Sequence, residues 1–165
     1  MTRTPAARAR ASSVGLAAGY LGRPDLDATT FGTRDGVRWL RTSDVGELTD
    51  GRLTVLGRVD DLINTGGAKV SPAAVEHLVA ELDGVGDVCV VGVPDPEWGQ
   101  SVTAVIVRSG QANAPTLDSV RAHVTRSLGG PAAPRHLVVI DRLPTRGPGK
   151  TDRRAVALLA AARLT

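Results

Sequence analysis

Residues 88–107 read VCVVGVPDPEWGQSVTAVIV, and this stretch decides the fold. Two apolar runs, residues 88–93 and 102–107, stand on either side of the turn signal Pro94-Asp95-Pro96. The first run is apolar at nearly every position, which is typical of a strand buried on both faces. The second run is rich in β-branched residues, which favour strands. The stretch therefore predicts two strands inside a covered sheet.

The flanking sequence predicts two amphipathic helices. Ser71-Pro72 is a typical helix start, because Ser accepts a hydrogen bond from a free backbone N–H and Pro suits the first helical position. Thr116 can start the second helix in the same way. The apolar residues of each helix then recur on one face, namely Val75, Leu78, Val79 and Leu82 in the first and Leu117, Val120, Val124 and Leu128 in the second.

Two short β-hairpins are expected before the first helix. Asp50-Gly51 lies between the strand-like residues 37–41 and 53–56, and this dipeptide favours a hairpin turn. Gly66-Gly67 lies between residues 62–63 and 69–70, and indicates a tight turn with positive φ. Residues 1–35 have no sustained periodicity, so we expect an irregular arm there.

Together these elements predict an α+β fold. A third strand is expected at residues 137–140, and a short Ala/Leu-rich helix with Asp152 as its cap is expected near the end. The prediction is a small three-stranded sheet flanked by two amphipathic helices, plus short β-hairpins and an irregular N-terminal arm.

Composition excludes several classes of protein. Only 2% of residues are aromatic, too few for a platform on which nucleic-acid bases stack. One cysteine excludes an internal disulfide framework, and three widely spaced histidines give no metal-ligand spacing, so no metal site is expected. There is no apolar run of about 18 residues, so we expect no membrane span and a cytoplasmic protein.

Charge is distributed unevenly along the chain. The formal net charge is +3, but residues 1–41 carry +4, residues 42–120 carry −8 and residues 121–165 carry +7. Basic ends suit nucleic acid, a phosphate-bearing ligand or an acidic protein. They are equally typical of an ordinary solvated surface.

Three polar positions are candidates for chemistry. Lys150, in Gly147-Pro148-Gly149-Lys150, has a flexible setting from which it can bring a point charge to a phosphate. Asp44 follows a strand, where a carboxylate can hold ribose hydroxyls or simply cap a turn. Arg58 stands near two carboxylates and can form a local ion pair. Neither a Gly-x-Ser-x-Gly elbow nor a complete phosphate-binding loop is present.

Several short motifs follow one another along the chain. They are Gly19-Tyr20-Leu21-Gly22-Arg23-Pro24, Thr42-Ser43-Asp44, Asp50-Gly51-Arg52-Leu53, Gly57-Arg58-Val59-Asp60-Asp61, Gly66-Gly67-Ala68-Lys69-Val70-Ser71-Pro72, Val91-Gly92-Val93-Pro94-Asp95, Trp98-Gly99-Gln100, Leu143-Pro144 and Gly149-Lys150-Thr151-Asp152-Arg153. In this order they resemble the carboxy-terminal part of the adenylate-forming acyl-CoA synthetases, the AMP-binding enzyme family. The wording at residues 96–100 and 146–150 resembles the o-succinylbenzoate–CoA ligases of menaquinone biosynthesis most.

The resemblance implies two half-reactions: a carboxylate attacks ATP to give an acyl-adenylate, and CoA then displaces AMP. It implies ATP, CoA and Mg²⁺ as cofactors, with the Mg²⁺ ligand outside this chain. The residue roles that it implies are ATP binding by Asp44 and Arg58, a hinge at Asp60, CoA or pantetheine binding by Gly66, Gly67, Trp98 and Arg135, and stabilisation of charge during adenylation by Lys150.

The resemblance also implies how the chain is organised. Residues 1–60 would be an arm left from the end of a large amino-terminal domain, including the hinge, and residues 61–165 the mobile carboxy-terminal domain. This acid–thiol ligase fragment would act only with a separately encoded amino-terminal adenylation domain, on a small carboxylate substrate, without nucleic acid or membrane. Ser43 and residues 129–133 depart from the family pattern. Two alternatives stay open: a non-catalytic basic module that binds nucleic acid or an acidic protein, and an inactive gene fragment.

Overall fold

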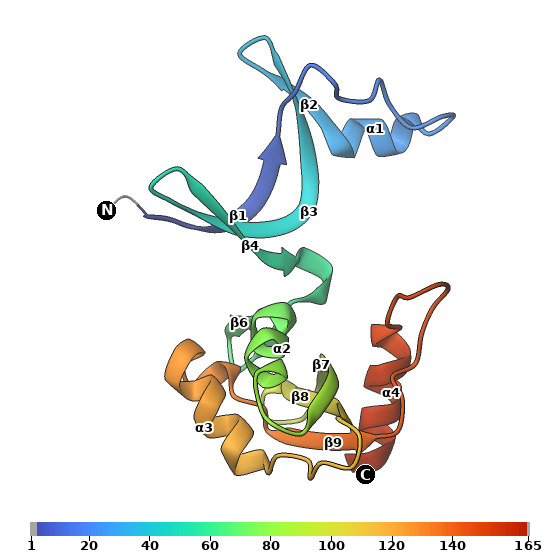
Figure 1. Ribbon diagram of the computed structural model, residues 1–165. Coiled ribbons are helices and arrows are strands. Elements are labelled where there is room, and N and C mark those ends of the chain that lie inside the picture. Colours follow the sequence, from blue (N-terminus) through green and yellow to red (C-terminus); the bar gives the residue numbers. More distant parts are fainter. Residues whose placement is uncertain (1–2, 165) are drawn as a thin grey trace. The chain divides into compact units, whose positions relative to one another are not determined.

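The computed structural model describes residues 3–164, and the side chains of residues 7–55 and 57–164. The chain forms two compact units, one ending at Asp60 and one beginning at Asp61. Each unit has its own β-sheet (Figure 1).

The N-terminal unit is built around one long strand. Strand β3 (Val37–Thr49) pairs antiparallel with β1 (Arg3–Ala11), β2 (Phe31–Arg34) and β4 (Arg52–Arg58), and α1 (Pro24–Thr30) precedes β2. Asp50 and Gly51 have φ values of 48° and 80°, and join β3 to β4 in a turn whose twist matches that of the strands. The predicted hairpin is confirmed.

The predicted irregular N-terminal arm is confirmed only at residues 12–23 and is wrong for the described residues on either side. Residues 3–11 form β1, and residues 24–34 form α1 and β2. Strand β1 reads RTPAARARA, without any β-branched residue except Thr4, so its local sequence gives little strand signal. It is a strand because the 13-residue β3 offers it a long edge of backbone hydrogen-bonding groups.

The C-terminal unit has a five-stranded sheet. Strands β7 (Val85–Asp95) and β8 (Gly99–Arg108) form its antiparallel centre, and β9 (His136–Ile140) pairs parallel with β8. The hairpin of β5 (Ile63–Thr65) and β6 (Ala68–Val70) joins β8 at its beginning, through Thr65 and Gly99. All three predicted strands are present, and the predicted second hairpin extends the expected three-stranded sheet to five strands.

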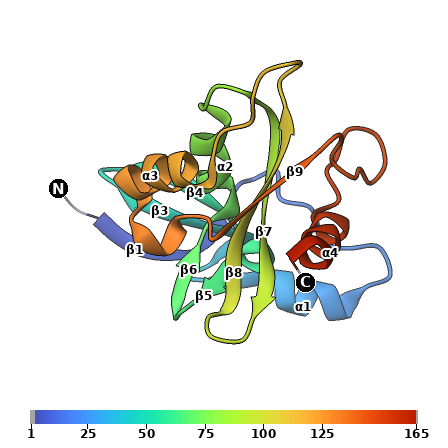
Figure 2. The same ribbon diagram turned by 90° about the horizontal axis from the view of Figure 1, so that it is seen from below.

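Helices cover both faces of this sheet. Helices α2 (Pro72–Ala80) and α3 (Leu117–Leu128) pack on one face, and α4 (Arg153–Leu164) packs on the other (Figure 2). Val102, Ala104 and Ile106 of β8 point toward α2 and α3, whereas Val105 belongs to the cluster around α4. The α+β class is confirmed, and the helix expected after Asp152 forms a third covering element in addition to the two that flank the predicted sheet.

The predicted helix caps are confirmed in atomic detail. The Ser71 hydroxyl accepts a hydrogen bond from the Ala74 N–H at 3.3 Å, and the Thr116 hydroxyl accepts one from the Ser119 N–H at 3.2 Å. At α4 the Asp152 carboxylate accepts one from the Ala155 N–H at 3.0 Å. Such caps contribute about 1 kcal/mol each. Within residues 3–164, every helix is too short or too polar to cross a bilayer.

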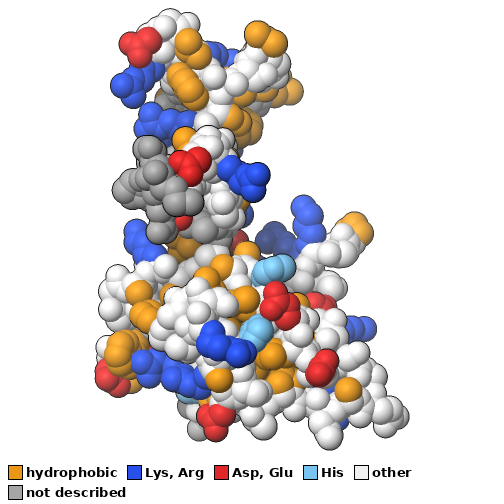
Figure 3. Space-filling view, turned by 60° about the vertical axis from the view of Figure 1, so that its left-hand side comes forward, with side chains coloured by type: hydrophobic (Ala, Val, Ile, Leu, Met, Phe, Trp, Pro, Cys, Tyr) orange, Lys and Arg blue, Asp and Glu red, His pale blue; other side chains and the backbone are white. Residues whose placement is uncertain are grey.

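The two units differ in how far their apolar side chains are exposed. Many large apolar residues of the N-terminal unit are exposed, including Leu48, Leu53 and Val55. Figure 3 shows hydrophobic side chains, in orange, on the surface of this unit. Leu48 and Leu53 are register partners on β3 and β4, so they share one face of the sheet.

Candidate functional site

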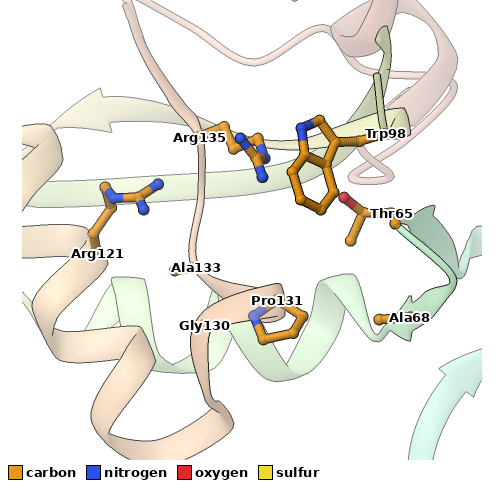
Figure 4. A pocket seen from close by; sticks show the side chains of 9 residues that line it. Thr65, Ala68, Trp98, Arg121, Gly130, Pro131, Ala133 and Arg135 are labelled. Carbon is orange, nitrogen blue, oxygen red and sulfur yellow. The ribbon is translucent and has the colours of Figure 1, made fainter. Parts of the chain in front are cut away.

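A pocket of about 210 Å³ opens in the C-terminal unit. Its walls come from the β5–β6 hairpin, the turn before β8, the first half of α3 and the segment between α3 and β9 (Figure 4). The lining residues are Thr65, Gly66, Ala68, Trp98, Arg121, Gly130, Pro131, Ala133 and Arg135.

Trp98 is held in this wall by the chain around it. The Asp95 carboxylate accepts hydrogen bonds from the N–H groups of Glu97 and Trp98, both at 3.0 Å. The Gly66 N–H donates to the Trp98 carbonyl at 3.0 Å. Gly66 has a φ of 54°, and a Cβ atom at this position would overlap the Trp98 ring. Gly66 is therefore required both for its turn and for the position of Trp98.

The residues after Trp98 connect the turn before β8 to the β5–β6 hairpin. Gly99 has a φ of 74° and pairs with Thr65 across the sheet. The Gln100 side-chain carbonyl accepts a hydrogen bond from the Asn64 N–H at 2.8 Å. The Trp98-Gly99-Gln100 motif thus fixes the aromatic wall of the pocket against the β5–β6 hairpin.

Arg135 stacks on Trp98. Its guanidinium carbon lies 4.0 Å from the centroid of the indole ring, and the backbone N–H of Arg135 donates to the Val102 carbonyl at 2.8 Å. A cation in this position is worth about 0.5–1 kcal/mol at an exposed site. The Trp98 Nε1 atom is buried and has no hydrogen-bond partner in the part of the chain that the structure describes. A flat ring next to a guanidinium can bind a planar base that carries phosphate.

The wall opposite Trp98 is formed by Gly130 and Pro131 (Figure 4). Arg121 of α3 supports this wall, because it donates a hydrogen bond to the Pro134 carbonyl at 2.8 Å. Ala132 and Ala133 are buried under it. The sequence departure at residues 129–133 therefore puts a proline ring, and no aromatic side chain, across the pocket from the indole.

Asp44 and Arg58 lie together in the N-terminal unit. They are register partners on β3 and β4, and the Asp44 N–H donates to the Thr42 hydroxyl at 3.1 Å. Arg58 also pairs with Asp60, at 3.9 Å between side chains that are mostly exposed. Such a pair contributes little to stability. Asp60, the predicted hinge, is the last residue of this unit.

Lys150 lies on a separate loop of the C-terminal unit, away from the residues that line the pocket. The loop closes through a bridge between Thr145 and Thr151 and a hydrogen bond from the Arg146 N–H to the Lys150 carbonyl at 2.7 Å. Gly147 and Gly149 in its tip have φ values of 67° and 73°. The loop thus presents the exposed Lys150 side chain at the end of a closed hairpin-like turn.

Residues 74–150 match the family model described as AMP-binding enzyme C-terminal domain. The chain belongs to this family. The chain is 44% identical over 148 residues to the medium/long-chain-fatty-acid–CoA ligase FadD8 of Mycobacterium tuberculosis. It is 46% identical over 121 residues to the probable 2-succinylbenzoate–CoA ligase of the same organism. These matches cover 86% and 72% of the chain, which spans only 25% and 32% of the two relatives.

A solved structure has the same fold as this chain. The amide bond synthetase McbA from Marinactinospora thermotolerans matches it with a TM-score of 0.83 and 31% identity, over 97% of this chain and 32% of that one. The family resemblance expected from the short motifs is confirmed. The narrower resemblance to o-succinylbenzoate–CoA ligases is not decided, since relatives named for other acids are about as similar.

The structure groups the predicted site residues of the chain in three places. Gly66, Trp98 and Arg135 line one pocket, and Gly67 lies in the adjoining turn with open space around it. Asp44, Arg58 and Asp60 belong to the N-terminal unit, and Lys150 to its own loop. The ligand-binding and catalytic roles of all these residues stay predictions.

Sequence reasoning missed Arg121 and Pro131 as pocket residues. Arg121 gave no signal, because it is an exposed polar position of an amphipathic helix. The Gly/Pro-rich run at residues 129–134 was the one available signal, since such runs bring backbone close to a ligand.

Proposed function

We propose that this chain is the C-terminal part of an ATP-dependent acid–thiol ligase. The enzyme would join a carboxylic acid to CoA in two steps, by way of an acyl-adenylate. The observation that carries the proposal is the pocket in which Trp98 and Arg135 stack, within a domain whose relatives are named as CoA ligases. The reaction would take place in the cytoplasm, where ATP and CoA are available.

The pocket would hold the nucleotide end of CoA. Trp98 offers a flat ring for the adenine, and Arg135 offers a guanidinium for the phosphates. The thiol arm would pass the Gly66-Gly67 turn, where the absence of side chains lets a thin chain lie close to the backbone.

Other residues would act in adenylation. Asp44 would accept hydrogen bonds from the ATP ribose, and Arg58, its cross-strand partner, would bind the same nucleotide. When a carboxylate oxygen bonds to the α-phosphorus and pyrophosphate leaves, negative charge develops on the phosphate oxygens. Lys150 would stabilise that charge, because its ammonium extends from a closed loop. Mg²⁺ would be held by the large domain.

For the acid, we propose o-succinylbenzoate, the substrate class of an enzyme of menaquinone biosynthesis. The support is 46% identity with a probable 2-succinylbenzoate–CoA ligase. The similar identity with FadD8 makes a fatty acid the competing choice. The acid itself would bind to the large domain. The identity of that domain would therefore determine whether the substrate is o-succinylbenzoate or a fatty acid.

The partner would be an amino-terminal adenylation domain, encoded separately or on the same polypeptide. The chain spans a quarter to a third of its relatives, and ATP and acyl contacts from a large domain would have to complete the site. Alone, the chain should release no pyrophosphate from ATP, CoA and o-succinylbenzoate. Release above background by protein free of contaminating ligase would contradict this.

The test is a pair of variants in the chain joined to, or mixed with, the large domain of the 2-succinylbenzoate ligase relative. Lys150→Ala should slow acyl-adenylate formation by about 10²–10³-fold and leave CoA attack on supplied acyl-adenylate nearly unchanged. Gly67→Trp should do the reverse, because an indole would fill the open space beside this turn. Equal loss of both steps in both variants would overturn the assigned roles.

A second candidate function is a module that binds nucleic-acid phosphates. It is favoured by a pocket in the N-terminal unit that Arg10, Arg34, Arg41 and Trp39 line. Arg10 and Arg41 are register partners, and like charges directly opposite one another destabilise a sheet unless an anion binds there. The test is to measure the affinity of the chain for DNA of arbitrary sequence at several salt concentrations. An affinity that falls steeply as salt rises supports this candidate, and an affinity that does not fall in this way contradicts it.

A further inference from the structure

One ion pair in the C-terminal unit joins residues 77 positions apart. Arg153, the first residue of α4, meets Glu76 of α2 through two parallel hydrogen bonds. Nη1 donates to Oε1 at 2.7 Å and Nη2 to Oε2 at 2.8 Å. The side chains are only 35% and 18% exposed. This two-pronged geometry, partly shielded from water, is the strong form of an ion pair.

The backbone of β7 completes the arrangement. Arg153 Nη1 also donates to the Val90 carbonyl at 3.0 Å, and the Val90 N–H donates to Glu76 Oε1 at 2.7 Å. The hydrogen bonds to Glu76 raise the pKa of Arg153 above its usual range. Helices α2 and α4, which cover opposite faces of the sheet, are thus connected around one residue of β7.

Arg153 stands three residues after Lys150, at the base of the loop. Asp152, between them, donates from its N–H to the Pro144 carbonyl at 2.8 Å, and its own carbonyl accepts from the Val156 N–H at 3.0 Å. The tip of the loop has two glycines, and residues 145–150 are all exposed. Its direction is therefore set where it joins α4, by Asp152 and Arg153.

We propose that Glu76 and Arg153 are positioning residues that fix the base of the Lys150 loop to α2 and β7. The consequence for catalysis rests on the proposed function, in which Lys150 acts in adenylation. A lysine at the end of a glycine-rich loop gains from a fixed base, because a charge must be placed to well below 1 Å to stabilise a transition state fully.

A purely stabilising pair would behave differently from a positioning pair. Loss of a stabilising pair increases hydrogen exchange throughout the unit, since it lowers the free energy of global unfolding. Loss of a positioning pair releases the loop and leaves the sheet intact. Arg153→Lys separates the two, because it keeps the charge and removes the fork that binds both Glu76 oxygens and Val90.

The first experiment uses the chain alone and follows amide hydrogen exchange by NMR. In Arg153→Lys the amides of Arg146 and Asp152, which close the loop, should exchange about tenfold faster, and those of Val105 and Ile106 in β8 should not change. Arg154→Lys, at the exposed neighbouring position, is the matched control and should leave all four amides unchanged. Equal acceleration in β8 and in the loop, or none in the loop, would overturn the proposal.

The second experiment measures catalysis with the large domain supplied. Arg153→Lys should lower kcat for acyl-adenylate formation by about 10- to 100-fold, with KM for ATP and the thioester step unchanged. Glu76→Gln keeps an oxygen for the Val90 N–H and should lose less than Glu76→Ala. A parallel loss in both half-reactions would contradict a positioning role. If the unaltered assembly makes no adenylate, the proposed function fails, while the exchange experiment still decides whether the pair holds the loop.

Discussion

The two units of this chain have similar proportions of regular structure and very different cores. Every buried apolar core residue that the structure identifies, from Ile63 to Ala160, belongs to the C-terminal unit. Among the described side-chain positions of the N-terminal unit, only Gly46 is buried. Its exposed large apolar residues, among those described, are Val14, Tyr20, Leu21, Val37, Leu48, Leu53 and Val55.

The difference teaches that paired strands are not a core. The strands of the N-terminal sheet pair with one another, but Leu48 and Leu53 on one of its faces stay exposed among the residues that the structure describes. The C-terminal sheet is covered on both faces by its own helices. In the proposed enzyme, the large domain would supply the missing layer of the N-terminal unit.

The largest expected effect comes from separating the units. Residues 61–165 produced alone should unfold in one cooperative transition, because their sheet and three helices bury each other. Residues 1–60 alone should show no cooperative transition, since little apolar area is buried there to offset chain entropy. Circular dichroism with temperature measures both. A sigmoidal transition in residues 1–60 would break the comparison.

The next effect is a matched pair of truncations in the full chain. Ile106→Ala, at a position with 0% exposure, should lower the free energy of unfolding by about 2–5 kcal/mol. Leu53→Ala, at a position with 53% exposure, should change it by less than about 0.5 kcal/mol. Urea denaturation gives both values. Equal losses would mean that Leu53 has a packed environment.

A third comparison uses the two adjacent glycines of the β5–β6 turn. Both have positive φ, so alanine costs about 1–3 kcal/mol in backbone strain at either position. Only at Gly66 does the new methyl group also meet the Trp98 ring. The free energy of unfolding of Gly66→Ala should therefore be lower than that of Gly67→Ala by about 1 kcal/mol. Gly66→Ala should also shift the Trp98 fluorescence, whereas Gly67→Ala should not shift it. Matching spectra would show that Trp98 does not depend on Gly66.

The smallest effect concerns Cys89 in the core beside α4. Burial raises the pKa of its thiol from an ordinary value of 9.0 to about 11. Between these values the unfolded chain has lost the proton and the folded chain has kept it. The contribution of Cys89 to stability is thus fully present below pH 9.0 and is lost as the pH rises through about 11.

Unfolding in urea at about pH 8 and about pH 10 measures this effect, with Cys89→Ala as the control that removes it. The unaltered chain should lose more stability than Cys89→Ala over this interval. An identical loss in both proteins would show that the Cys89 thiol titrates normally.

Local features of the fold could be predicted from the sequence, and features that depend on distant residues could not. The caps Ser71, Thr116 and Asp152 each act within three residues, so their spacing alone indicates them. Strand β1 has almost no strand propensity of its own, and exists because β3 pairs with it. The pairing of Glu76 with Arg153 gave no signal either, because it depends on the packing of two helices around β7.

The candidate site divides in the same way. Trp98 and Gly66 could be predicted as site residues because their motifs resemble those of a family. Nothing in the sequence indicates that these two residues contact one another. Pro131 and Arg121 line the same pocket, but their spacing in the sequence forms no motif that would predict this. A pocket wall formed by four separate segments has no periodicity that a single sequence can display.

Strand β8 changes its neighbour partway along one edge. Since β7 occupies the other edge from Gly99 to Arg108, β5 and β9 must share this one. β5 meets it at Gly99 in antiparallel direction, and β9 meets it from Thr103 onward in parallel direction. The pocket lies where the two neighbours diverge. Open sheets in other folds also bind ligands where their topology switches. The order of the strands thus produces the pocket, whichever side chains line it. Substitutions at Trp98, Pro131 or Arg135 could therefore change which ligand binds there while the scaffold stays the same.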